Sequence, residues 1–171
     1  MGVIINPRTA NPFLPGVSTL IKENMTADTH TGADAIHQFA LVPAGMFPIG
    51  RKLRVAWAGS KNGTSNAATF NIRLGPLNTT SDTKLTTVGI TLAASNQSAS
   101  TLAEFYRTDA TTIRVITSGA ITPRTAGTLT AANMQDITLS AGVMDAAFYV
   151  TLSCSLTTEI YTNRLFYVEV F

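Results

Sequence analysis

The chain has 171 residues, a length that fits one globular domain. Charged residues make up only 13% and the net charge is +2, which excludes the strong basic surface of a nucleic-acid-binding protein. The sequence contains no run of about 18 apolar residues, so it predicts no membrane-spanning helix. The single cysteine, Cys154, excludes an internal disulfide. The 27 threonines and 22 alanines, with few lysines and glutamates, favour strands over helices.

Residues 1–16 are predicted to form an extended arm ahead of a folded domain over residues 17–171. Pro7, Pro12 and Pro15 remove backbone donors and oppose both helix and central strand. The arm nevertheless carries large apolar side chains, which either pack back on the domain or dock on another chain. We expect docking, through a set of six residues: Ile4, Ile5, Pro7, Arg8, Phe13 and Leu14.

The pattern of the remaining residues predicts about ten short strands separated by turns rich in glycine, proline and threonine. Expected strands cover residues 17–22, 36–42, 52–58, 68–74, 85–92, 100–107, 111–117, 135–139, 147–156 and 165–171. Residues 100–107 fit either a strand or one helical turn, and we favour the strand because the neighbouring residues are rich in threonine. Alternation places Leu53, Val55 and Trp57 on one face of their strand. Cys154 lies on the apolar face of the strand over 147–156, so a small buried hydrophobe is favoured over a reactive thiol. Regularly spaced short strands without helical periodicity predict an all-β sandwich or barrel.

The polar residues form no recognisable catalytic or metal-binding motif. His30 and His37 with nearby aspartates suggest either a metal site or, as we prefer, a polar loop leading into a strand. Two opposed carboxylates would be needed for glycoside hydrolysis, and the candidates are few and scattered. They are Glu104, Asp109, Asp136 and Asp145. We therefore expect no enzyme activity and no cofactor.

Arginines alternate with apolar neighbours on several expected strands. Arg54, Arg73 and Arg114 should therefore point away from the core. Such residues form either a surface for polyanions or hydrogen bonds between subunits, for which arginine is better suited than lysine. Because the net charge is small, we favour the subunit interface.

Part of the chain resembles a pattern found in virion proteins of tailed phages. The resemblance rests on residues 39–55 (FALVPAGMFPIGRKLRV), on 56–59 (AWAG) with the turn after it, and on 69–75 (TFNIRLG). A final strand after Thr162-Asn163-Arg164 also fits. Proteins of this kind are jelly-roll β-sandwiches that act as capsid decoration proteins, head fibres or tail fibres, often as trimers. The resemblance thus implies a jelly-roll-like antiparallel sandwich and carries no functional site with it.

We therefore expect a structural component of a bacteriophage virion, most simply a decoration protein that binds the major capsid protein. It would be a homo-oligomer, expected to be a trimer, on the particle surface, made in the host bacterial cytoplasm and contacting neither nucleic acid nor membrane. The scarcity of charge fits surfaces that face other subunits. The alternative is a fibre module that recognises host glycan, with Tyr106, Tyr149 or Tyr161 stacking on sugars.

Overall fold

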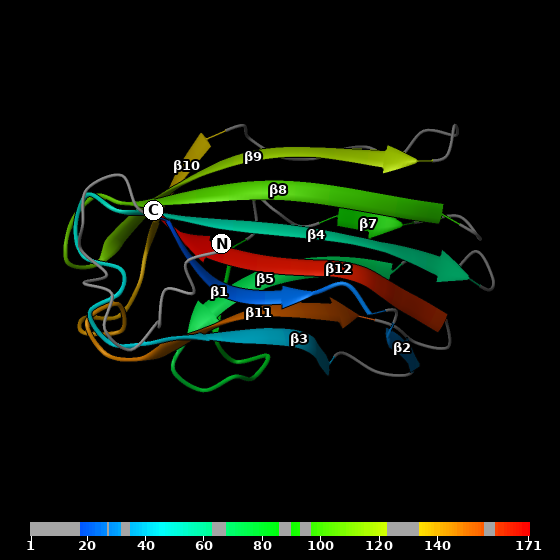
Figure 1. The fold of residues 1–171 in the computed structure, drawn as a ribbon, viewed down its shortest axis with the longest axis horizontal. Coiled ribbons are helices and arrows are strands. Elements are labelled where there is room, and N and C mark those ends of the chain that lie inside the picture. Colours follow the sequence, from blue (N-terminus) through cyan, green and yellow to red (C-terminus); the bar gives the residue numbers. More distant parts are fainter. Residues whose placement is uncertain are drawn as a thin grey trace, which may run out of the picture.

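The protein is all-β, with two antiparallel sheets packed face to face (Figure 1). The computed structural model describes residues 18–26, 28–31, 35–62, 68–85, 90–92, 97–122, 134–155 and 160–171. The expected arm lies outside these residues, and with it the six arm contacts: Ile4, Ile5, Pro7, Arg8, Phe13 and Leu14. Within the described ranges, no helix is long and apolar enough to cross a membrane.

Among the described residues, the larger sheet has seven strands. In spatial order they are β1 (Thr19–Asn24), β12 (Ile160–Val170), β4 (Lys52–Asn62), β8 (Gln97–Arg107), β9 (Thr112–Thr122) and β10 (Met134–Thr138), and β2 (Asp28–Thr31) also pairs with β12. The five-stranded sheet contains β3 (Ala35–Val42), β11 (Phe148–Ser155), β5 (Ala68–Gly75) and β6 (Thr83–Lys84), and β7 (Ile90–Leu92) also pairs with β5.

These strand orders are those of a jelly roll. In a jelly roll the first, last, third and sixth strands form one sheet, while the second, seventh, fourth and fifth form the other. Here β1, β12, β4 and β8 occupy the first set of places, and β3, β11, β5 and β6 occupy the second. Strands β9 and β10 extend the larger sheet beyond β8. The structure thus confirms the expected jelly-roll sandwich.

The core lies between the two sheets and follows from the alternation of apolar residues. Leu53, Val55 and Trp57 of β4 are all buried, as the sequence predicts. Trp57 meets Phe70 of the other sheet with ring centroids 5.0 Å apart, which joins the two layers. Cys154 is fully buried on the inner face of β11, in agreement with the prediction of a core residue.

Two local predictions differ from the structure. Residues 28–31 form the short strand β2, whereas the sequence predicts a polar loop there. They pair with β12, so a long-range partner overrides a weak local signal. The strand expected over 85–92 also differs at its start, because Leu85 is buried outside a strand, directly after the short strand Thr83–Lys84. Its end forms the strand Ile90–Leu92, and residues 86–89 lie outside the described residues.

Candidate interaction surface

The outer face of the seven-stranded sheet carries charged side chains that pair with one another. At its centre, Glu104 of β8 accepts hydrogen bonds from Arg54 Nε and Nη2, at 3.1 and 2.9 Å, on one carboxylate oxygen. The hydroxyl of Tyr106 donates to the other oxygen at 3.0 Å, and Lys52 Nζ lies 3.2 Å from the first. Burial opposes ionisation of this carboxyl, but the donors outweigh it and hold the pKa of Glu104 below its usual value.

A second acidic group extends this network toward β12. The hydroxyl of Tyr167 donates to Glu169 Oε2 at 2.6 Å, and Arg54 Nη1 lies 3.8 Å from the same oxygen. Burial, with the hydrogen bond to Glu169 next in importance, raises the pKa of Tyr167 to about 12. The ring of Phe171 lies 4.3 Å from the Arg54 guanidinium carbon and 4.7 Å from Lys52 Nζ, so both cations also contact an aromatic face.

A separate ion pair lies on the outermost two strands of the sheet. Arg114 of β9 donates from Nε and Nη2 to the two carboxylate oxygens of Asp136 on β10, at 2.8 and 2.9 Å. The two residues are direct partners in the strand register. The hydrogen bond from Arg114 is the main cause that lowers the pKa of Asp136. Both side chains remain about half exposed, so this pair is open to solvent.

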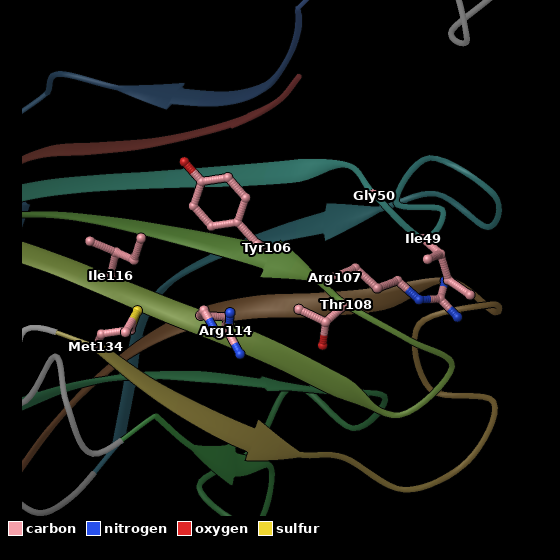
Figure 2. A pocket seen from close by; sticks show the side chains of 8 residues that line it. All are labelled: Ile49, Gly50, Tyr106, Arg107, Thr108, Arg114, Ile116 and Met134. Atoms are coloured by element: carbon pink, nitrogen blue, oxygen red, sulfur yellow. The ribbon is translucent and has the colours of Figure 1, made fainter.

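Next to this pair the surface is hollowed (Figure 2). The hollow has a volume of about 530 Å³ and is lined by Ile49, Gly50, Tyr106, Arg107, Thr108, Arg114, Ile116 and Met134. Ile116 is 40% exposed and its register partner Met134 is 60% exposed. The hollow therefore combines an aliphatic wall with Arg114, the arginine of the ion pair. Such a lining suits an apolar side chain of a protein partner.

The outer face of the five-stranded sheet carries a second exposed apolar group. Phe39 and Leu41 of β3 are 49% and 47% exposed. Phe39 packs edge-to-face against Tyr149 of β11, with ring centroids 6.0 Å apart. Leu41 and Tyr149 are register partners, so the three side chains form one patch, called the β3–β11 patch below. Both outer faces of the sandwich thus expose large hydrophobic side chains.

Of the three arginines predicted to point outward, Arg73 differs most in environment. Arg54 and Arg114 lie on the outer face of the larger sheet, paired as described. Arg73 points away from the core but is only 9% exposed. Its guanidinium donates to the backbone oxygens of Thr80 and Asp82 and to Ser153 Oγ, so it anchors the loop over 76–82 on its own sheet. Contact of these arginines with another subunit stays a prediction.

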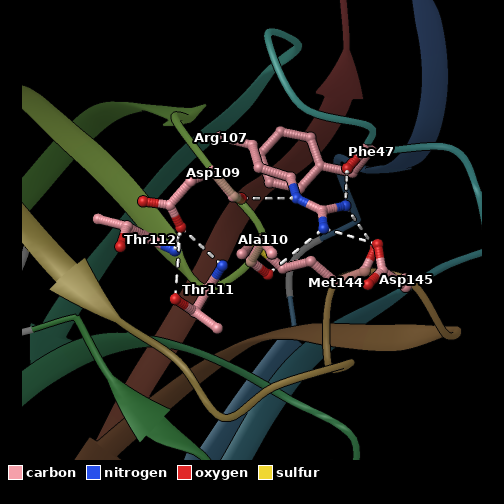
Figure 3. A network of polar contacts seen from close by, with 8 residues as sticks. All are labelled: Phe47, Arg107, Asp109, Ala110, Thr111, Thr112, Met144 and Asp145. Atoms are coloured by element: carbon pink, nitrogen blue, oxygen red, sulfur yellow. Dashed lines mark hydrogen bonds and ion pairs between the residues drawn. The ribbon is translucent and has the colours of Figure 1, made fainter.

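The candidate carboxylates accept hydrogen bonds from different donors. Glu104 and Asp136 belong to the two networks above. Asp109 accepts hydrogen bonds from the backbone N–H groups of Thr111 and Thr112, at 2.8 and 2.7 Å, which lower its pKa and close the β8–β9 turn. Asp145 accepts from Arg107 at 2.6 Å (Figure 3).

The buried arginine at this end of the sandwich is a residue whose role sequence reasoning missed. Arg107 ends β8, and its guanidinium donates to a set of backbone oxygens (Figure 3): Phe47, Asp109, Ala110 and Met144. Its position at the end of an alternating strand gave no signal of burial, because the acceptors come from three separate loops. Arg107 therefore ties these loops together.

Three residues considered in the sequence analysis remain: His30, His37 and Tyr161. His37 is buried within β3. The side chains of His30 and Tyr161 lie outside what the structure describes, although both residues are in strands that pair with each other. Among the described residues, no three histidine, cysteine or acidic side chains gather as a metal site. No family model matches the chain, and no curated protein matches it.

Proposed function

We propose that the chain is a structural component of a bacteriophage virion, a decoration protein that binds the major capsid protein on the particle surface. In this role the protein is a homo-oligomer that functions by binding other proteins. The proposal rests on the virion-like sequence pattern and on the jelly-roll sandwich that carries it.

The observation that carries the proposal is the exposure of large apolar side chains on both outer faces of a sandwich whose core is already filled. Ile116 and Met134 lie on one face, and the β3–β11 patch lies on the other. Contiguous exposed apolar groups on a small domain mark interaction sites. The low charge content supports the same conclusion, because an isolated soluble domain usually carries about twice as many charged residues.

A glycan-binding fibre module is the weaker candidate. Sugar recognition needs aromatic faces together with unengaged polar groups. The hydroxyl of Tyr106 is already bonded to Glu104, and Tyr149 packs against Phe39. The hollow beside Tyr106 is lined mainly by Ile49, Ile116 and other apolar groups, which favours a protein side chain.

Co-sedimentation tests the proposal directly. Purified chain is mixed with expanded heads of the phage whose genome encodes it, assembled without this protein. We expect the wild type to sediment with the heads and Leu41→Lys to bind at least about tenfold more weakly, because it places a charge in the β3–β11 patch. Ser81→Lys, a matched change in the exposed loop over 76–82, should bind as the wild type does. A wild-type chain that stays in the supernatant overturns the proposal.

A further inference from the structure

The outer face of β9 and β10 has a regular pattern of side chains. Three register pairs lie on this face, one above the other: Thr112 with Thr138, Arg114 with Asp136, and Ile116 with Met134. Val115 and Ile113, between them on β9, are fully buried in the core, so the three pairs point outward. Each pair joins residues of matching or complementary chemistry across the two strands.

This pattern is self-complementary under a twofold rotation. The twofold axis runs parallel to the strands and passes midway between β9 and β10. It lies between two copies whose outer faces point toward each other. The rotation places β9 of the second copy over β10 of the first. Arg114 of one copy then faces Asp136 of the other, and Ile116 faces Met134.

The charges on this face favour a second copy of the chain over a partner that carries a strong positive or negative charge. The Arg114–Asp136 pair is neutral as a unit, so it gives no field that would attract a strongly charged partner. Two such pairs related by the axis form a ring of four charges with alternating sign. Because each pair is about half exposed, docking exchanges solvent for these contacts without breaking either pair.

The shape of this face also fits a second copy of the chain. Met134 protrudes, with 60% of its surface exposed, and Ile116 lines the adjacent hollow of about 530 Å³ (Figure 2). The rotation brings Met134 of the second copy over Ile116, where the hollow can receive a flexible side chain. The apolar contact and the charge ring therefore form in one docking geometry.

We infer that two copies of this chain associate face to face through β9 and β10, around a twofold axis between Arg114 and Asp136. The inference concerns how copies meet, and it is independent of where the assembly lies on a particle. Mass in solution tests this contact, whereas binding to heads tests the proposed function. The sequence predicts a trimer, so the mass also decides between a threefold and this twofold contact.

Complementary charge reversal gives the sharpest test. Arg114→Asp gives a face with two acids, and Asp136→Arg gives a face with two arginines, so each variant repels its own copy. An equimolar mixture restores opposite charges across the axis, although neither chain regains its internal ion pair. We expect light scattering at about 100 µM to give twice 18.1 kDa for the wild type and the mixture, and 18.1 kDa for each variant alone.

Two further variants separate the contact from general effects on the fold. Met134→Lys should give the monomer mass with an unchanged circular dichroism spectrum. Leu41→Lys, on the opposite face of the sandwich, should keep the wild-type mass. A wild type of 18.1 kDa or of three times that mass overturns the inference. So does a mixture of the two charge variants that remains monomeric.

Discussion

Arg107 and Asp145 form an ion pair whose two partners differ in exposure. The guanidinium of Arg107 is 3% exposed and lies 2.6 Å from Asp145 Oδ1, whereas the Asp145 side chain is 64% exposed. The charge of Arg107 is thus inside the protein, held by one carboxylate and four backbone oxygens, while its counter-ion remains in water. The arginine therefore contributes mainly through the loops it holds.

Replacing Arg107 should strongly destabilise the sandwich. Arg107→Met removes the donors of four backbone oxygens, and we expect the free energy of unfolding to fall by about 3 to 5 kcal/mol. Asp145→Asn leaves those bonds in place and should cost about 1 kcal/mol or less. Urea unfolding followed by tryptophan fluorescence measures both. Equal losses in the two variants would contradict the role given to Arg107.

Position 75, at the end of β5, requires glycine because there is no space for a side chain. A β-carbon at this position would overlap the side chain of Asp82, which accepts hydrogen bonds from the backbone of Leu77 and Thr79. We expect Gly75→Ala to cost about 1 to 3 kcal/mol. The cost should fall by at least about 0.5 kcal/mol in an Asp82→Ala background, since the obstacle is then gone. Gly142→Ala is the control, because open space surrounds it and its cost should not depend on Asp82.

The acid stability of the protein should depend on Glu104. Its pKa in the folded chain lies below the usual 4.5, so the native state binds fewer protons than the unfolded state in this range. The contribution of Glu104 is therefore complete above pH 4.5 and is lost as the pH falls through the folded pKa. Glu104→Gln should flatten the loss of unfolding free energy between about pH 5 and pH 3. An unchanged acid slope in the variant would refute the assignment.

Tyr167 should ionise late in an alkaline titration. Its pKa is raised to about 12, from an ordinary value of 10.0, by burial and by the bond to Glu169. Because the folded pKa is the higher one, the stability it contributes is present below pH 10 and is lost as the pH rises toward 12. The absorbance at the tyrosinate band, wild type minus Tyr167→Phe, should show a midpoint near pH 12. A midpoint near 10 would exclude the partly buried hydrogen bond from Tyr167 to Glu169.

The sequence predicted those features that alternation alone determines. The strand expected over 36–42 is Ala35–Val42, and Leu53, Val55 and Trp57 are buried together as expected. A period of two with apolar residues on one side is sufficient for such strands. The jelly-roll order came from the resemblance, since local patterns do not specify which strands pair.

The outer surfaces were harder to predict because their environment depends on contacts between distant segments. Alternation places Arg73 outside the core, but only the folded loop over 76–82 shows that its donors are engaged there. In the same way, the register that sets Arg114 beside Asp136 joins residues 22 positions apart. No local pattern in the chain indicates either relationship.

Labelling of purified particles tests the central claim most directly. Particles produced by the genome that encodes this chain are purified, incubated with antibodies against the folded chain and gold, and imaged by electron microscopy. The proposed function predicts label distributed over the surface of the head, and none on particles from a genome that lacks the gene. Particles that carry no label, and contain none of the chain by mass spectrometry, would contradict a virion role.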